Sequence, residues 1–326
     1  MSKRNCTLPA DVLDLLLRGK GIAHVRDARL AGVDESRLRR LAAAGGLERL
    51  ARGCYASTST LEKLDEWQVH KIRARAFAES CAAVYLCEWS AAVTWDLPTM
   101  GTPPPRPTVL RPATSGQGST VTRYGRIRVA HLPIGHRWRS GRVGVASRAW
   151  SVADLARFVP LPHALVLADA ATRAGDDLGA VLPHFHRWEG VDGARWAADH
   201  ADGNAESPIE TLGRFTCIAF DLPLPVANAW VGENQPVRRV DGLWPYHWAA
   251  KEADGAVKYN NRPDASAIVM AQNDREFYLR RLGLDVIRYG WELAAFRREE
   301  LAARIAALLR DKSGAVRADP MVEARA

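Results

Sequence analysis

The sequence lacks the features of a membrane or secreted protein. Its longest apolar runs, such as Ala164–Ala171 (ALVLADAA), are far shorter than the roughly 20 residues that a membrane-spanning helix needs. The N-terminal segment MSKRNCTLPADVL shows no charged head followed by an apolar signal core. We therefore expect a cytoplasmic protein that does not bind a membrane.

Cysteine is scarce, and its spacing forms no pattern. The five cysteines are odd in number and scattered along the chain: Cys6, Cys54, Cys81, Cys87 and Cys217. No two of them form a C-x-x-C pair or a cluster with histidine, which argues against a disulfide framework and against a structural zinc site. We expect reduced thiols.

Acidic residues are absent from one long stretch. Between Leu97 and Ala153 there is no Asp or Glu, but there are nine arginines: Arg106, Arg111, Arg123, Arg126, Arg128, Arg137, Arg139, Arg142 and Arg148. Solvated surfaces usually mix both signs of charge, and clustered arginine commonly neutralises phosphate. The stretch predicts a nucleic-acid surface with Arg123, Arg126 and Arg128 as contacts. The alternative is a basic patch facing an acidic partner protein or another part of the same chain.

The composition indicates a globular protein, and its N-terminal segment has the pattern of a small DNA-binding domain. With 326 residues, 47% of them apolar, the chain can bury a core and form two or three domains. Helical patterns occur in ADVLDLLLRG, HVRDARLAG and ESRLRRLAAAG, and a hairpin is predicted in GLERLARGCYAS. Gly19 and Gly32 end the first two helices, and Asp34 is the expected N-cap of the third. This is the order of a winged helix-turn-helix.

The third predicted helix has an apolar face and a basic face. Leu38, Leu41 and Ala42 share the apolar face. In a winged helix the third helix enters the major groove while the wing contacts the DNA backbone. The predicted contacts to double-stranded DNA lie on the opposite face of this helix and in the hairpin turn: Ser36, Arg37, Arg39, Arg40 and Arg52. The alternative is a helical protein-interaction module with a solvated basic face.

The middle of the chain mixes helices and strands. A long helix is predicted from Leu64 to Ala83, and a second one in CEWSAAVTWDLP. Strand-like runs follow in PTVLRP, GRIRVAHLP and RVGVAS, and helical patterns follow in SVADLARFV and HALVLADAATRAG. No catalytic pattern is visible in this part.

Several of these segments together resemble the AbiEi-like antitoxin and transcriptional-regulator proteins. They are the arginine-faced third helix, Gly53-x-Tyr55 after the wing, CEWSAAVTWDLP, and SRAWSVADLARF with LADAATRAG. The resemblance spans about residues 10 to 310. It implies a winged helix at the N-terminus and a C-terminal domain similar to the very-short-patch-repair endonucleases, with a restriction-endonuclease-like core.

These patterns predict an α/β fold, α+β overall, divided into four parts. They are a winged helix-turn-helix (1–60), a basic α+β middle domain (61–200), an endonuclease-like α/β domain (201–312) and a disordered tail (313–326). The C-terminal domain is expected to contain strands in VRRVDGLW, HWAAKEADG and LDVIRYG, a helix in IVMAQNDREFYLRRLG, and a final helix in WELAAFRREELAARIAALLR.

Glu210 has two interpretations. In ESPIETLGRF, Ser207 can cap a helix, Pro208 suits the first turn and Glu210 falls at the third position, which matches a capping box. In nuclease-like folds of the type implied by the resemblance, a glutamate of the first helix often points at the metal site. The two roles do not exclude each other.

Asp241 and Glu252 are the predicted metal ligands. They lie on two candidate strands around the turn at Pro245-Tyr246, and they converge if the register of the hairpin allows it. Mg²⁺ and Mn²⁺ favour oxygen ligands, and Mg²⁺ often takes only one or two protein carboxylates. Such an ion assists phosphodiester hydrolysis, because it lowers the pKa of a bound water and neutralises charge on the phosphate.

The pattern resembles the PD-(D/E)xK nuclease signature with one departure. Asp254 stands where a lysine is expected after Glu252, and a carboxylate cannot supply the positive charge that orients or activates water. Either Lys258 reaches back from beyond Gly255, or Asp254 is a further metal ligand. A third interpretation is that EADG simply ends a strand, with its carboxylates in solvent.

Two functions follow from these patterns. The first is a DNA-binding protein with a Mg²⁺- or Mn²⁺-dependent nuclease-like domain that cleaves phosphodiesters through Asp241, Glu252, Asp254, Lys258 and Glu210. The second is a non-catalytic transcriptional repressor or antitoxin of a type IV toxin-antitoxin system, whose partner would be a nucleotidyltransferase-like toxin.

Overall fold

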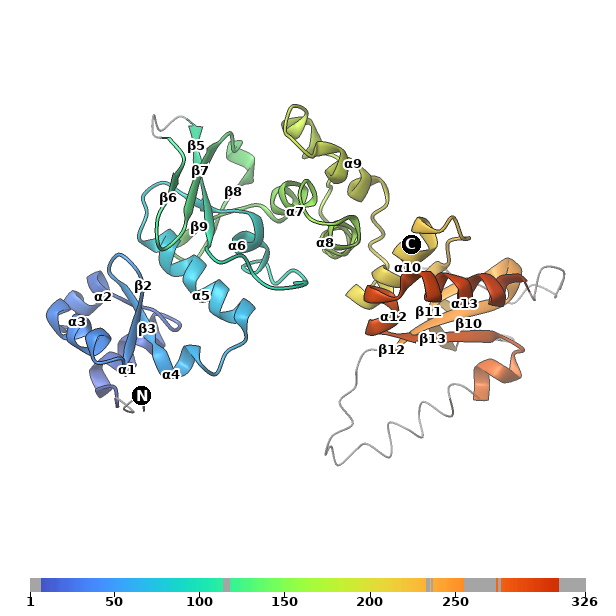
Figure 1. Cartoon of the computed structure of the whole chain (residues 1–326), viewed down its shortest axis with the longest axis horizontal. Helices are drawn as coiled ribbons and strands as arrows, with labels where there is room; N and C mark the ends of the chain where they lie inside the picture. The colour runs from blue at the N-terminus through green and yellow to red at the C-terminus, as the bar shows by residue number, and fades with distance from the viewer. Residues whose placement is uncertain are drawn as a thin grey trace. The chain divides into compact units, whose positions relative to one another are not determined.

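The structure, a computed structural model, divides the chain into two compact units (Figure 1). Unit 1 consists of Met1–Val159 and Asp177–Arg195, and unit 2 of Pro160–Asp176 and Trp196–Ala326. The residues that it describes are 7–113, 118–232, 235, 237–254, 274 and 277–310. Both units combine helices with sheets, which confirms the α/β class. None of the described helices is long and apolar enough to cross a membrane.

The N-terminal part of unit 1 confirms the predicted order of three helices and a hairpin. Its elements are α1 (Ala10–Arg18), β1 (Ala23–His24), α2 (Val25–Leu30), α3 (Glu35–Ala43), β2 (Leu47–Ala51) and β3 (Cys54–Ser57). β3 lies between β1 and β2 in an antiparallel sheet. The core beneath contains Val12 of α1, Leu38 of α3 and Tyr55 of β3, with Leu41 and Ala42 packed against it.

Local signals set the ends of these elements. The carboxylate of Asp34 accepts a hydrogen bond from the backbone N–H of Ser36, so Asp34 is the N-cap of α3 as predicted. The turn between β2 and β3 contains Gly53 at φ +71°, a left-handed conformation that glycine adopts without strain. The turn thus holds the side chain of Arg52 at the exposed tip of the wing.

The rest of unit 1 is built on a six-stranded mixed sheet. The strand order is β6-β7-β5-β4-β9-β8. The strands are β4 (Tyr85–Leu86), β5 (Thr108–Pro112), β6 (Thr120–Val121), β7 (Arg126–Ala130), β8 (Arg137–Ser140) and β9 (Val143–Ala146). The helical segments are α4 (Thr58–Leu61), α5 (Glu66–Glu79), α6 (Glu88–Ala92), α7 (Arg148–Ala156), η2 (Ile134–His136) and η3 (Leu182–Phe185). The three predicted strands appear as β5, β7 and β9.

Unit 2 is built on a four-stranded sheet of order β10-β11-β12-β13. Its elements are α8 (Leu161–Arg173), α10 (Pro208–Ala219), β10 (Val226–Val231), β11 (Arg238–Trp244), η4 (Pro245–His247), β12 (Ala249–Asp254), β13 (Asp285–Gly290), α12 (Trp291–Phe296) and α13 (Arg298–Arg310). α9 (Val191–Asp199) crosses the division between the units. β12 and β13 are parallel, and the other neighbours are antiparallel. α10 contacts β12, α12 and α13.

The long predicted helices are shorter in the structure. α5 ends at Glu79, before the left-handed Ala83, so it does not reach the predicted end. The predicted final helix is two helices that meet at Arg297, whose backbone (φ −125°, ψ 46°) is not helical. Half of the predicted helix IVMAQNDREFYLRRLG (268–273, 275 and 276) and all of the tail 313–326 lie outside the described residues.

The division into units does not follow the predicted boundary near residue 200. α8 belongs to unit 2, because Asp169 of this helix bonds to side chains of α10. The predicted boundary at residue 60 falls inside unit 1, where α5 contacts both β2 and β3. The four predicted parts therefore stay a prediction about domains, beside two observed compact units.

Candidate functional site

The α3 helix presents its basic side chains away from the core. Leu38 is fully buried, whereas Arg39 and Arg40 are exposed. The Arg39 guanidinium donates to Glu35 one turn earlier, at 2.6 Å, and Arg40 donates to the Ser36 hydroxyl at 3.3 Å. An exposed pair of this kind contributes only about 0.3–0.5 kcal/mol. A phosphate group can therefore replace these partners at little cost.

The other two predicted contacts on α3 are partly engaged within the protein. Arg37 forms an ion pair with Asp11 of α1 at 2.5 Å, which ties α3 to α1. The Ser36 hydroxyl donates to the N-cap carboxylate of Asp34 at 2.6 Å. Arg52 is exposed in the wing turn. Arg39, Arg40 and Arg52 are thus the predicted contacts that are most accessible to DNA.

The predicted contacts in the acid-free stretch divide into two kinds. Arg123 and Arg126 are exposed, as a surface for phosphate requires. The side chain of Arg128 is only 13% exposed, because its guanidinium pairs with Glu88 at 3.3 Å and with the buried carboxylate of Asp154. Arg128 therefore serves an internal network, and a phosphate contact would require it to leave these carboxylates.

Part of this basic stretch faces other parts of the same chain. Arg142 pairs with Asp27 of α2 at 2.5 Å. Arg137 instead donates within the stretch, to the carbonyl oxygen of Leu132 at 2.9 Å. The acids that balance Arg128 and Arg142 thus come from outside the acid-free stretch. The sequence left open that the basic patch faces another part of the same chain. This interpretation holds for Arg128 and Arg142.

The hairpin of β11 and β12 brings the predicted metal ligands together. The strands pair in the register Gly242–Lys251, Leu243–Ala250 and Trp244–Ala249. One step further along the two strands, Asp241 stands opposite Glu252. The Asp241 carboxylate accepts a hydrogen bond from the backbone N–H of Ala253 at 2.7 Å. Glu252 is 5% exposed.

Lys251, a residue that sequence patterns did not single out, is buried on the face of β12 opposite to Glu252. It precedes Glu252 directly, so its side chain projects from the other face of β12. Its ammonium group donates to the backbone oxygen of Glu210 at 3.1 Å and to the Tyr289 hydroxyl at 3.2 Å. Burial lowers its pKa. Gly242 leaves the room that the lysine needs, since a Cβ there would lie 2.6 Å from the Lys251 Cε.

Glu210 is fully engaged in capping α10, which is one of its two predicted roles. Its carboxylate accepts hydrogen bonds from the backbone N–H of Glu206 at 3.0 Å, the Ser207 hydroxyl at 2.6 Å and the Asn228 amide at 3.0 Å. In return, Ser207 accepts from the Glu210 N–H at 3.4 Å. A metal ion at Glu210 would have to displace at least one of these donors.

The positive charge near Asp254 comes from a neighbouring strand. Arg288 of β13 lies beside Glu252 in the parallel register and 3.5 Å from the Asp254 carboxylate. Asp254 itself is half exposed at the end of β12. Nothing in the sequence indicated this parallel pairing. Lys258, the other predicted source of charge, lies outside the described residues.

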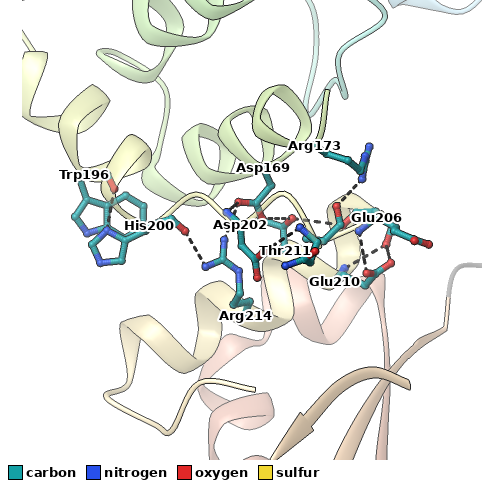
Figure 2. Close-up of polar contacts among 12 residues, drawn as sticks. Asp169, Arg173, Trp196, His200, Asp202, Glu206, Glu210, Thr211 and Arg214 are labelled. Atoms are coloured by element: carbon teal, nitrogen blue, oxygen red, sulfur yellow. Dashed lines mark hydrogen bonds and ion pairs between the residues drawn. The ribbon is translucent and has the colours of Figure 1, made fainter. Parts of the chain in front are cut away.

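A buried polar network joins α8 to α10 beneath this region (Figure 2). Asp169, 1% exposed, accepts hydrogen bonds from the Thr211 hydroxyl, the Arg214 guanidinium and the Asp202 backbone N–H, all at 2.7–2.8 Å. Arg214 also donates to the carbonyl oxygen of His200 at 2.8 Å. Figure 2 shows Asp169 pointing from α8 toward these donors. The network fixes the helix that carries Glu210.

The described cysteines fit the predicted reduced thiols. Cys54, Cys81, Cys87 and Cys217 are free. Burial raises the pKa of Cys54 to about 12 and that of Cys217 to about 11. Because the thiolate is the reactive form, these two buried thiols are inert at neutral pH.

Comparisons with known proteins give a family match for the N-terminal segment. Residues 11–58 match the family described as "Transcriptional regulator, AbiEi antitoxin". Two curated proteins of Mycobacterium tuberculosis, from strains CDC 1551 and H37Rv and each described as an uncharacterized protein, are 30% identical to the chain over 185 residues. That alignment covers 55% of this chain and 66% of each relative. The AbiEi resemblance is therefore confirmed for residues 11–58, and the endonuclease resemblance stays a prediction.

Proposed function

We propose that the chain is a DNA-binding transcriptional regulator of the AbiEi antitoxin type. The observation that carries the proposal is that the segment matching this family, residues 11–58, has the helices and wing of a winged helix with an exposed arginine face on α3. Arg39 and Arg40 would contact DNA in the major groove, and Arg52 at the wing turn would contact the backbone.

The proposal extends to a protein partner. The family description names an antitoxin, so a toxin protein is the expected partner, and a nucleotidyltransferase-like toxin of a type IV system is the specific proposal. Winged-helix residues occupy only the first part of unit 1. The rest of the chain would then supply the surface that the toxin binds.

Replacing Arg39 and Arg40 together by alanine is expected to weaken duplex binding by about tenfold or more. Each lost base contact costs roughly 1–3 kcal/mol. Both side chains are exposed, so the fold should be unaffected. Fluorescence anisotropy with a duplex chosen by selection from a random-sequence library measures the affinity, and circular dichroism checks the fold.

Arg18→Ala is the matched control for this double variant. Arg18 is also an exposed helical arginine in an i,i+4 ion pair, with Asp14 at 2.8 Å, but it lies on α1. Its replacement removes the same kind of surface pair without touching α3. Equal affinities of the double variant and the wild type would refute α3 as the DNA-reading helix.

A second candidate function is metal-dependent cleavage of phosphodiesters, favoured by the register that sets Asp241 opposite Glu252. Within the described ranges, no three side chains of Asp, Glu, His or Cys are grouped to hold a metal ion. A cation here would therefore have Asp241 and Glu252 as its protein ligands, with the remaining positions left to water and phosphate oxygens. Asp254 would be a further ligand only if it turned from Arg288.

Millimolar Mn²⁺ or Mg²⁺ is expected to raise the melting temperature if these carboxylates share a cation. A ligand that binds only the folded chain stabilises it by mass action, by about 2.7 kcal/mol at a hundred times its Kd. Asp241→Ala and Glu252→Ala should each abolish the shift, while Glu292→Ala, an exposed glutamate of unit 2, should keep it. A wild-type melt that neither ion moves, with DNA absent and present, would exclude the cleavage function.

A further inference from the structure

Unit 1 contains a pocket of about 410 Å³ that the proposed DNA-binding helix does not use. It lies along β7 and the end of α7, and its lining includes Arg126, Arg128, Arg157, Phe158 and Trp188. We call it the arginine pocket. Its volume falls within the range of small-molecule sites, about 300–1,000 Å³. The lining thus combines three arginines with two aromatic rings.

The floor of the arginine pocket is a buried network of fixed charges. Asp154, fully buried, accepts from Arg157 at 3.1 Å and from both terminal nitrogens of Arg128. Arg128 also pairs with Glu88, a carboxylate of the lining, whereas Asp154 lies beneath the lining residues. Three guanidiniums therefore face two carboxylates, and one positive charge is left over. That charge belongs to the rim residue Arg126, which is exposed and has no ion pair in the part of the chain that the structure describes.

The aromatic rings of the pocket are held by the same guanidiniums. The Arg157 guanidinium lies 4.4 Å from the centroid of the Phe158 ring and 4.8 Å from that of Trp188, and Arg128 lies 5.6 Å from Trp188. Phe158 nevertheless stays 54% exposed. Internal pairing explains Arg128, Arg157 and Asp154, but it does not explain why an exposed ring and an arginine without an ion pair in the described part of the chain line the same pocket.

We propose that the arginine pocket binds a nucleotide, with the phosphate at Arg126 and the base stacked on Phe158. Phosphate is a dianion that accepts several hydrogen bonds from a guanidinium. A base is a flat ring that stacks on an exposed aromatic side chain without need of a specific sequence. This ligand goes beyond duplex binding by the winged helix, because a base in a duplex is not free to stack on Phe158. Its source is either a free nucleotide or an unpaired position in a strand.

Calorimetry on the full chain tests the proposal with four probes: inorganic phosphate, adenosine, adenosine monophosphate and a short single-stranded oligoadenylate. The monophosphate is expected to bind at least about tenfold more tightly than phosphate or adenosine alone, because only it engages both halves of the site. Competition by the oligoadenylate for the bound monophosphate would identify a strand as a source, and its failure to compete would identify the free nucleotide.

Substitutions at two exposed residues test the phosphate position and the base position of the site separately. Arg126→Ala and Phe158→Leu should each weaken monophosphate binding by about tenfold, whereas Phe158→Tyr keeps the ring and should restore it. Arg123→Ala is the matched control, since Arg123 is an exposed arginine of the same stretch but is not part of the lining. The Arg39/Arg40 double variant should bind the monophosphate normally, so a failure of the winged-helix proposal would be distinguishable.

Three results would overturn the nucleotide site. They are no heat of binding with the monophosphate at millimolar concentration, equal affinity for phosphate and monophosphate, and equal losses in Arg123→Ala and Arg126→Ala. Equal affinity for phosphate and monophosphate would show that the base does not contribute to binding. Equal losses in the two arginine variants would show that a basic surface attracts the phosphate without a specific site.

Discussion

Asp169→Ala is expected to lower the free energy of unfolding of unit 2 by about 3–5 kcal/mol, the cost of breaking a buried ion pair. The substitution leaves the Arg214 guanidinium, 8% exposed, without its carboxylate. It also leaves the Thr211 hydroxyl and the Asp202 N–H without their acceptor. Burial raises the pKa of Asp169, because removal from water disfavours its charged form.

Hydrogen exchange of the α10 amides during urea titration of the full chain measures this loss, because it reports on unit 2 by itself. Glu292→Ala is the control, since it removes a surface ion pair with Arg297 and should cost less than about 1 kcal/mol. The double variant Asp169→Leu/Arg214→Met should recover much of the loss, because it leaves no buried charge. A loss below about 1 kcal/mol in Asp169→Ala would refute the structural role of the network.

Acidification is expected to destabilise unit 1 through His70. This ring is 4% exposed on α5, its Nε2 lies 3.1 Å from the Ser90 hydroxyl, and burial lowers its pKa to about 4. The unfolded chain takes up the proton near pH 6.5, whereas the folded chain resists it until about pH 4. The free energy of unfolding should therefore fall by about 3 kcal/mol as the pH drops through this window, with no change above it.

His70→Gln isolates this contribution from the carboxylates that titrate in the same range. Glutamine keeps a polar group near Ser90 but does not titrate. The difference between the wild-type and variant free energies of unfolding should be constant above about pH 7 and should shrink by about 3 kcal/mol toward pH 4. A difference that does not change with pH would show that His70 is not held neutral in the folded protein.

The winged helix could be predicted because its signals are local. The spacing of Leu38, Leu41 and Ala42 reports one helical face, and Asp34 marks where that helix begins. A tight turn such as the one at Gly53 needs only adjacent residues. The hairpin of β11 and β12 was predicted for the same reason, since its two strands are joined by a short turn. The prediction that Ser207 caps α10 was equally local, and it is confirmed.

Contacts between residues that are distant in the sequence could not be predicted from such local signals. Asp169 and Arg214 are 45 residues apart, and Arg128 and Asp154 are 26 apart. Nothing in the sequence around Arg128 distinguishes it from the exposed Arg126, although one is internal and the other lies on the surface. Strands of two residues, such as β4 and β6, are too short to show a periodic pattern.

The sequence by itself determined the winged helix with its arginine face, the α/β class and the hairpin that carries Asp241 and Glu252. These depend on periodicity, caps and turns, which act within a few residues. Only the tertiary structure decided which charges are available. Packing pairs Arg128 with Asp154 and Glu210 with its capping partners, because a buried charge needs a partner in the fold. Arg37 pairs with Asp11 at the surface. The same packing left Arg126 and Phe158 exposed in the lining of the arginine pocket.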